Sequence, residues 1–286
     1  MKHPLRKACL ILHIVRGMVL AALVYPRMPH DRQQKMIRDW SQRMLAICGI
    51  KLVVHQHGET LASGAMLVGN HISWIDIYVI DAWRPTPFVS KAEIAKWPVI
   101  GWLAKTIGTV FIQREKRSDA KKIMHQLADI LSSGGLIALF PEGTTTDGKT
   151  VQPFHANMFQ APVLAGAPIQ PIGLMYEDAQ GRQSPAADYI GDTTLGQSID
   201  MILSASPLTA HLYVGAPLAP ATDRRQLAAQ AQQAVSLALE YLQAGCGVGA
   251  AAGVIGSVSA NVSALSGPPL SVSAAQSEPA QTQAAR

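Results

Sequence analysis

The chain has 286 residues, a formal net charge of +5 at pH 7 and 48% hydrophobic residues, enough to bury the core of a sizeable globular domain. Its three cysteines, Cys9, Cys48 and Cys246, are far apart in the sequence. Their spacing excludes the usual metal-binding and redox motifs and indicates free thiols in a reducing compartment.

Positive charge is concentrated in residues 1–50, which contain nine Lys or Arg and two Asp. Residues 8–25 are strongly apolar but interrupted by His13 and Arg16, and a stretch of about 18 residues is marginal for crossing a bilayer. A second helical pattern covers residues 31–49. Two basic, apolar helices in succession predict a membrane-associated pair that anchors the chain on an anionic cytoplasmic leaflet. A cleavable signal peptide is disfavoured because no small-residue cleavage site follows, and packing of the first helix as a core element is the other alternative.

Residues 51–244 contain about seven strand-like runs with helical patterns between them, which predicts an α/β domain. The runs are 52–54, 66–68, 87–90, 108–112, 136–140, 169–175 and 211–215. The clearest helices are expected at 118–131 and 222–243. Residues 245–286 consist almost entirely of Ala, Gly, Ser, Val, Pro and Gln, so we expect a low-complexity, disordered tail whose deletion leaves activity unchanged.

Residues 70–76 place His71 and Asp76 five positions apart, directly after an apolar strand. In an ideal helix such residues point about 140° apart, so the two side chains can meet only if His71 precedes the helix. Ser73 and Asp76 fit a capping box, which predicts a helix beginning at Ser73. His71 is then a candidate base and Asp76 the carboxylate that orients it. Alternatively, Asp76 only caps helix amides and His71 satisfies a loop carbonyl.

Polar or charged residues also follow three further predicted strands. They are Lys91, Arg114 and the group Glu142, Gly143 and Thr144. Open parallel α/β sheets bind ligands at the carboxyl ends of their strands. The four strand ends are therefore predicted to meet at one cleft.

Four ordered blocks of sequence resemble one known family. The blocks are Asn70-His71-x4-Asp76, Phe111-Ile112-Gln113-Arg114, Phe140-Pro141-Glu142-Gly143-Thr144 and Ala167-Pro168-Ile169-Gln170-Pro171. They look like the glycerolipid acyltransferases, and most like the bacterial 1-acylglycerol-3-phosphate acyltransferases. The resemblance implies a glycerol-3-phosphate acyltransferase-like α/β fold, with a mixed sheet flanked by helices. It also implies a membrane lysolipid as acceptor, acyl-CoA or acyl carrier protein as co-substrate, and no further cofactor.

One position departs from the family pattern. Members that form phosphatidic acid usually carry an arginine after Glu-Gly-Thr, whereas this chain has Thr145, a variant that is similar to the lyso-ornithine lipid acyltransferases. The resemblance therefore implies acylation of the 2-hydroxyl of 1-acyl-sn-glycerol 3-phosphate, with lyso-ornithine lipid as the alternative acceptor. An alternative from another class is a non-catalytic lipid-binding protein, which would have no need of His71 and Asp76.

Acyl transfer to an alcohol assigns a role to each candidate residue. The acceptor hydroxyl is the nucleophile, so His71 is expected to act as general base and no serine or cysteine nucleophile is needed. Arg114 is the implied contact for an acceptor phosphate, with Lys91 a second cation for it. Glu142 is expected to position the acceptor rather than act as a base. Substrate contacts are expected from Asn70, Gly143 and Thr144, Gly143 through exposed backbone amides. The alternatives are a surface ion pair for Arg114, a solvated Lys91 and an ordinary tight turn at Pro-Glu-Gly.

Two further segments invite interpretation. Residues 97–103, which include Trp97 and Trp102, are apolar enough to line an acyl-chain path or contact lipid, with plain core packing as the alternative. His55 and His57 share one face of a strand, but no third ligand is apparent, so no metal site is expected.

The basic amino-terminal region lacks the features of a nucleic-acid-binding fold, so a membrane is the expected partner. The expected location is the cytoplasmic face of a bacterial inner membrane.

Overall fold

The structure is a computed structural model that describes residues 3–97, 100–112 and 117–245, all within one compact unit spanning residues 1–251. The tail predicted at 245–286 lies outside the described residues beyond Gly245. In chain order the helices are α1 (His3–Leu23), α2 (His30–Cys48), α3 (Asp76–Trp83), α4 (Ile100–Thr106), α5 (Arg117–Ser132), α6 (Gln160–Ala165), α7 (Leu195–Ala205) and α8 (Arg224–Gly245). The strands are β1 (Ile50–Gln56), β2 (Met66–Gly69), β3 (Val89–Lys91), β4 (Val110–Ile112), β5 (Ile137–Leu139), β6 (Ile169–Glu177) and β7 (Leu208–Val214). Short 3₁₀ turns cover Tyr25–Arg27, Ile94–Lys96, Ala156–Phe159 and Pro185–Ala187.

Each of the seven predicted strand regions contains a strand, so the predicted mixed α/β architecture is confirmed. Five strands form one sheet in the order β1-β7-β6-β2-β5, parallel except for the antiparallel pair β6 and β7. β3 and β4 form a separate parallel pair, which a single bridge between Phe88 and Ala138 connects to β5. β2, β5, β3 and β4 therefore run in the same direction and their carboxyl ends point the same way.

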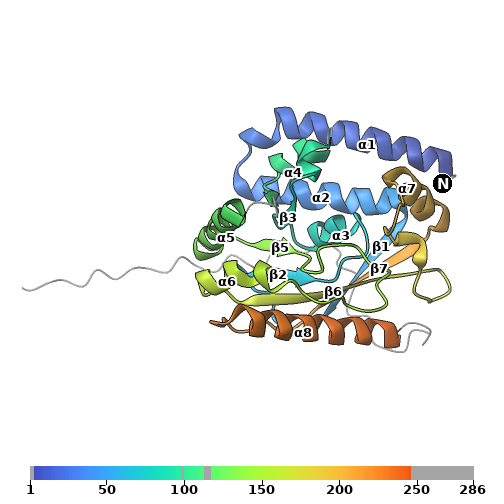
Figure 1. Cartoon of the computed structure of the whole chain (residues 1–286). Helices are drawn as coiled ribbons and strands as arrows, with labels where there is room; N and C mark the ends of the chain where they lie inside the picture. Colours follow the sequence, from blue (N-terminus) through green and yellow to red (C-terminus); the bar gives the residue numbers. More distant parts are fainter. Residues whose placement is uncertain (1–2, 98–99, 113–116, 246–286) are drawn as a thin grey trace, which may run out of the picture. The chain divides into compact units, whose positions relative to one another are not determined.

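Helices cover both faces of the sheet, as Figure 1 shows, with α2 and α3 on one side and α8 along the other. Alternate residues of each strand point to opposite faces, so the buried strands supply two cores. Leu67 and Leu174 contribute to the core beneath α2 and α3. Met66 and Val68 contribute to the core that α5, α6 and α8 close. The sheet is thereby fixed from both sides, and the loops at its carboxyl edge are held on a rigid base.

The two predicted amino-terminal helices are both present. α2 ends at Cys48, and the capping residue Gly49 has a φ of 71°, the left-handed conformation that glycine adopts easily after a helix C-terminus. α1 packs on α2 through the buried stripe Leu10, His13, Gly17 and Ala21. A Cβ on Gly17 would lie 2.7 Å from Nε1 of Trp40, so the close approach of the helices requires glycine there.

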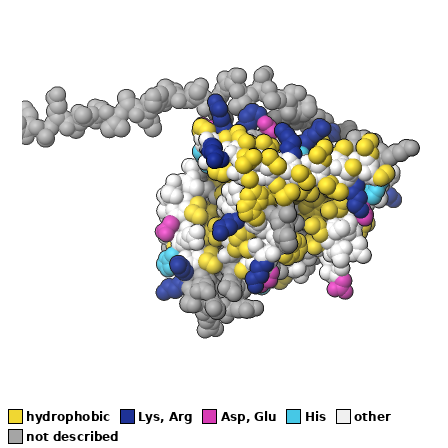
Figure 2. All heavy atoms as spheres, turned by 90° about the horizontal axis from the view of Figure 1, so that it is seen from above, with side chains coloured by type: hydrophobic (Ala, Val, Ile, Leu, Met, Phe, Trp, Pro, Cys, Tyr) yellow, Lys and Arg dark blue, Asp and Glu magenta, His cyan; other side chains and the backbone are white. Residues whose placement is uncertain are grey.

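The opposite side of α1 is apolar and exposed. Its large exposed side chains include Leu5, Ile11, Leu12, Val15, Val19 and Leu23. Figure 2 shows hydrophobic side chains gathered on this face, with Lys and Arg side chains at its margins. By length and composition the segment His3–Arg27 could also cross a membrane. The predicted alternative of an ordinary core element does not describe this helix, because only one stripe of it is buried.

Candidate active site

His71 lies in the turn between β2 and α3, at the carboxyl edge of the sheet. Helix α3 begins at Asp76, so the prediction that His71 precedes the helix is confirmed and the predicted start at Ser73 is wrong. Residues 73–75 instead form a turn in which the Asp76 N–H donates to the Ser73 carbonyl. That turn brings Nδ1 of His71 to 2.8 Å from Oδ2 of Asp76. With Nδ1 engaged, Nε2 is the nitrogen left to act on a substrate.

Asp76 is fully buried and accepts four hydrogen bonds. Oδ2 accepts from Nδ1 of His71 and from the backbone N–H groups of Ile72 (2.7 Å) and Ser73 (2.9 Å). Oδ1 accepts from the hydroxyl of Tyr176 at 2.6 Å. Three of these bonds converge on Oδ2 and one reaches Oδ1, so the carboxylate is held by donors from its own turn and from β6. The Asp76 side chain has an exposed fraction of 0%, against 21% for His71.

The peptide groups and ring of His71 are fixed by the turn after β5. The His71 N–H donates to Oε1 of Glu142 at 2.7 Å, and the His71 carbonyl accepts from the Thr146 N–H at 2.8 Å. The imidazole stacks on Phe140 with a centroid distance of 4.1 Å and parallel planes. Two strand ends that are 70 residues apart in sequence are therefore joined at one histidine.

Glu142 is buried, and both of its carboxylate oxygens accept backbone N–H groups. Oε2 accepts from Gln152 at 2.8 Å, while Oε1 accepts from His71. Burial raises the pKa of this carboxyl, and the two backbone donors oppose the rise. This arrangement favours a structural role in which Glu142 holds the His71 turn, and the acceptor contact expected from sequence stays a prediction.

The residues after Glu142 form the rim of the site. Gly143 has a φ of 71°, which a residue with a side chain adopts only at a cost, and Thr144 is exposed. The Thr145 hydroxyl donates to the carbonyl of Tyr189, whose own N–H donates to the Ile72 carbonyl at 3.0 Å. The strand-end loop and the 188–190 segment thus meet beside the His71 turn.

Acidic side chains lie next to this rim. Asp147 pairs with Lys149 at 3.0 Å, and both act electrostatically on Asp188. Burial, reinforced by the Asp147 charge, raises the pKa of Asp188 to about 6. A carboxylate on this rim disfavours a nearby anion and favours a cation.

Asn70 is fully buried against β6. Its side-chain NH₂ donates to the Leu174 carbonyl at 2.9 Å, and its side-chain oxygen accepts from the Leu174 N–H at 2.8 Å. The amide is thus occupied on both sides, and a contact with substrate would require it to break these bonds. These bonds favour a positioning role for Asn70, and the predicted substrate contact stays a prediction.

The two cations predicted to contact the acceptor are Lys91 and Arg114, and the structure describes only the backbone position of Lys91. Lys91 is the last residue of β3, beside the Phe88 bridge to β5, so its backbone lies at the expected strand end. Arg114 lies outside the described residues. In the segment predicted as an acyl path, Trp97 and Trp102 are exposed, and α4 neighbours α1.

Phe140 and Tyr176 complete the site but were not identified from sequence as site residues. Phe140 belongs to one of the four sequence blocks that resemble the family, but the sequence predicted no role for it. Tyr176 lies one residue beyond the strand predicted at 169–175. The only sequence signal for Tyr176 was that a tyrosine in a buried strand needs a hydrogen-bond partner.

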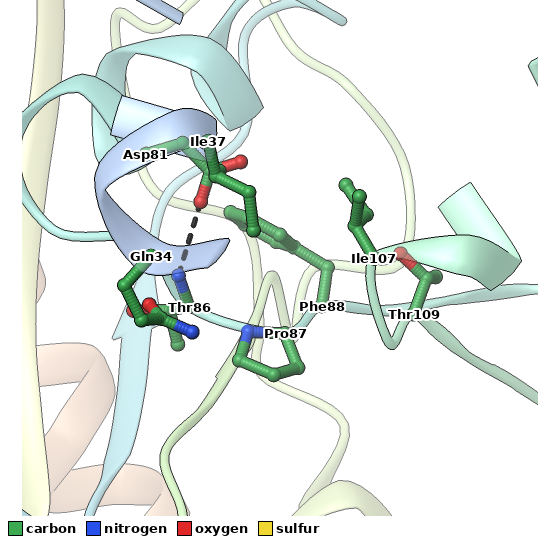
Figure 3. Close-up of a pocket in the computed structure, with 8 residues that line it drawn as sticks. All are labelled: Gln34, Ile37, Asp81, Thr86, Pro87, Phe88, Ile107 and Thr109. Carbon is green, nitrogen blue, oxygen red and sulfur yellow. Dashed lines mark hydrogen bonds between the residues drawn. The ribbon is translucent and has the colours of Figure 1, made fainter. Parts of the chain in front are cut away.

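A small cavity, shown in Figure 3, is lined by none of the candidate site residues described above. It is lined by Gln34, Ile37, Asp81, Thr86, Pro87, Phe88, Ile107 and Thr109. Oδ1 of Asp81 accepts from the Thr86 N–H at 3.0 Å, and burial raises the pKa of Asp81 to about 8. Phe88 stacks on Phe140 with a centroid distance of 6.0 Å, which connects the cavity wall to the residue beneath His71.

Among the described residues, no group of three or more His, Cys, Asp or Glu is arranged to hold a metal ion. His55, which we expected to lie outside any metal site, pairs through Nε2 with Nδ1 of His211 at 2.9 Å.

Comparison with known proteins places this geometry in context. Residues 51–175 match the family model described as Acyltransferase. The chain is 36% identical over 242 residues to a lyso-ornithine lipid O-acyltransferase of Pseudomonas aeruginosa, covering 82% of this chain and 92% of that protein. It is 33% identical over 181 residues to a 1-acyl-sn-glycerol-3-phosphate acyltransferase of Neisseria meningitidis, covering 63% of this chain and 70% of the relative. The crystal structure of the 1-acyl-sn-glycerophosphate (LPA) acyltransferase PlsC from Thermotoga maritima superposes with a TM-score of 0.61 at 18% identity, covering 85% of this chain and 98% of that one. At that identity the superposition establishes the fold alone.

Proposed function

The chain belongs to the acyltransferase family, and from that premise we propose that it transfers a fatty acyl group to a free hydroxyl of a membrane lysolipid, with His71 as general base. The observation that carries the proposal is the contact between Nδ1 of His71 and Oδ2 of the fully buried Asp76. That contact leaves Nε2 as the basic atom and stabilises the imidazolium that forms when Nε2 takes a proton.

The reaction follows from this geometry. Nε2 of His71 takes the proton of the acceptor hydroxyl as its oxygen attacks the carbonyl carbon of an acyl thioester. A new C–O bond forms, the C–S bond breaks, and the departing thiolate takes the proton back from Nε2. A positioned base supplies on the order of 10²–10⁴ in rate. The donor is a thioester of coenzyme A or of acyl carrier protein, both of which present the same carbonyl to His71.

The acceptor headgroup is the second part of the proposal. Thr145 stands where phosphatidic-acid-forming relatives usually carry an arginine, and Asp188 and Asp147 lie on the same rim. A phosphate monoester requires cations around it, whereas an ornithine headgroup carries an ammonium group as well as a carboxylate. These residues, together with the Pseudomonas relative, favour lyso-ornithine lipid as the acceptor. 1-Acyl-sn-glycerol 3-phosphate is the second candidate, favoured by the Neisseria relative.

We also propose that the apolar face of α1 binds the membrane. Leu12 is 69% exposed and Leu23 is 62% exposed. The opposite stripe of α1 packs on α2, where His13 stacks on Trp40. A helix held along one side and apolar on the other lies in the membrane interface, and its basic margins suit the anionic lipids of a cytoplasmic leaflet. The lysolipid acceptor would then reach the site from the bilayer.

Acyl transfer by membranes that contain the protein tests the function. Lyso-ornithine lipid and 1-acyl-sn-glycerol 3-phosphate are offered in parallel, each with acyl-CoA and with acyl carrier protein, against membranes lacking the protein. Product mainly from lyso-ornithine lipid would support lyso-ornithine lipid as the acceptor. Product mainly from 1-acyl-sn-glycerol 3-phosphate would make that lipid the acceptor instead. No product from any pair would overturn the proposal and leave a non-catalytic lipid-binding protein.

A further inference from the structure

We propose that Tyr176 is a positioning residue of the catalytic pair, whose hydroxyl holds the Asp76 carboxylate in the orientation from which Asp76 directs His71. This inference rests on the proposed role of His71 as general base. It assigns a function to a buried side chain of β6 that lies 100 residues from Asp76 in sequence.

The distribution of donors on Asp76 is the first argument. Oδ2 is shared by His71 and two backbone N–H groups, all from residues 71–73 of the same turn. Oδ1 has one donor among the described residues, the Tyr176 hydroxyl at 2.6 Å. The local turn therefore fixes one oxygen only, and Tyr176 is the group that resists rotation of the carboxylate about its Cβ–Cγ bond.

The attachment of the turn to β6 is the second argument. Asn70 is bonded through both amide atoms to the backbone of Leu174, and Asp76 is bonded to the side chain of Tyr176 two residues further along the strand. The two ends of the 70–76 turn are therefore tied to one buried strand, at positions two residues apart. The Asn70 bonds hold the backbone of the turn, whereas the Tyr176 bond acts on the carboxylate that meets His71.

The chemistry of the phenol is the third argument. Burial, followed by the charge of Asp76, raises the pKa of Tyr176 well above its ordinary value, so the hydroxyl remains a neutral donor at all working pH values. A hydrogen bond to Oδ1 draws negative charge away from the oxygen that faces His71. This bond therefore sets how strongly Asp76 stabilises the imidazolium, in addition to fixing its orientation.

The substitution Tyr176→Phe removes the hydroxyl and keeps the ring. With less charge drawn to Oδ1, more of the negative charge of Asp76 stays on Oδ2, the oxygen that faces His71, and Asp76 stabilises the imidazolium more strongly. Because only neutral imidazole acts as a base, we expect the acid limb of the kcat/KM profile to move up by about 0.5–1 pH unit. Looser orientation should lower kcat at the optimum by about tenfold and leave KM within about twofold.

Tyr78→Phe is the matched control. Tyr78 packs on the same core, between Trp40 and Trp74, and is not among the four donors to Asp76. It should leave both the pH profile and kcat unchanged. If Tyr176 serves only to fill the core, Tyr176→Phe will lower the melting temperature without moving the acid limb, and that result would overturn the inference.

Two further measurements separate this inference from the proposed function. In Asp76→Asn protein the carboxylate is absent, so adding Tyr176→Phe should have no further effect on kcat; a full additional loss would overturn the inference. Histidine ¹⁵N resonances, with that of His71 identified by its loss in His71→Ala, report the midpoint of His71 titration in detergent-solubilised full-length protein, whether or not it is active. An upward shift in Tyr176→Phe supports the inference even if no acyl transfer is found, and an unchanged midpoint overturns it.

Discussion

The Glu142 carboxylate accepts the backbone N–H of His71 at 2.7 Å, so the turn after β5 holds the peptide that carries the base after β2. Glu142→Gln replaces one of two acceptor oxygens with a donor, and either His71 or Gln152 then loses its partner. We expect kcat to fall by about tenfold or more, because leaving a buried N–H unpaired costs about 1–3 kcal/mol and displaces the turn.

Thr146→Val is the control for that experiment. Its hydroxyl contact to the His71 carbonyl is long, at 3.3 Å, and the shorter 2.8 Å bond from the Thr146 backbone survives the substitution. Steady-state kinetics should therefore show a change of less than about twofold. Equal losses in the two variants would show that Glu142 has no special part in holding His71.

His71→Ala removes the base and leaves the turn intact, since the backbone bonds of residue 71 to Glu142 and Thr146 remain. We expect acyl transfer to fall by about 10²–10⁴-fold with little change in melting temperature. The rate of acyl transfer and the melting temperature are measured on the same purified protein. Near-normal turnover by a well-folded variant would disprove the base assignment.

The pairing of His71 with Asp76 was predictable because both residues belong to one short turn. Their spacing is incompatible with a shared helix face and requires a turn before the helix, which is what forms. The common direction of β2, β3, β4 and β5 agrees with the prediction that their polar ends lie at one edge.

Tyr176 and Phe140 could not be assigned roles in the same way, because their partners are distant in sequence. Tyr176 meets Asp76 only because β6 is the neighbour of β2, and strand order is not encoded in a local pattern. The backbone partners of Glu142 could not be predicted for a similar reason, because whether a carboxylate faces substrate or backbone depends on the loop that folds over it, here through the N–H of Gln152. The acceptor contact expected of Glu142 stays a prediction.

Thr145→Arg tests the acceptor assignment. An arginine at this position adds a planar cation next to Asp147 and Asp188 and suits a phosphate. We expect the ratio of kcat/KM for 1-acyl-sn-glycerol 3-phosphate over lyso-ornithine lipid to rise by about tenfold, measured with both acceptors in competition. Thr144→Arg adds the same charge one residue earlier, on an exposed side chain, and should change the ratio much less. Equal changes would mean that position 145 has no particular access to the headgroup.

Asp81→Asn tests the buried carboxyl beside the small cavity. Burial raises the pKa of Asp81 from 3.8 to about 8, so the folded protein holds this proton more tightly than the unfolded chain does. The contribution of the protonated Asp81 carboxyl to the free energy of unfolding is therefore complete below about pH 4 and is lost as pH rises through about 8. Asn resembles the neutral carboxyl and lacks this dependence. Between about pH 5 and pH 8, the free energy of unfolding of the wild type should fall relative to the variant by at least about 1 kcal/mol.

Denaturant titrations at several pH values measure that difference. Asp39→Asn is the control, because Asp39 is an exposed partner of Lys35 and its removal should change stability by less than about 0.5 kcal/mol at every pH. Parallel stability curves for the wild type and Asp81→Asn would show that the Asp81 carboxyl is not held in its neutral form.

The apolar face of α1 provides the last prediction. Leu12 and Val19 are 69% and 50% exposed and lie seven residues apart, on the same side of the helix. Replacing both with Asp removes apolar surface and adds negative charge, so the partition coefficient onto vesicles of anionic phospholipid should fall by about tenfold or more. Leu237→Asp on α8 is the matched control, since Leu237 is 57% exposed on the opposite side of the sheet and should not affect binding. Because none of the hydrogen bonds and ring contacts described for His71 and Asp76 involves α1, transfer to a detergent-dispersed acceptor should persist in the double variant. Unchanged vesicle binding would mean that another surface meets the membrane.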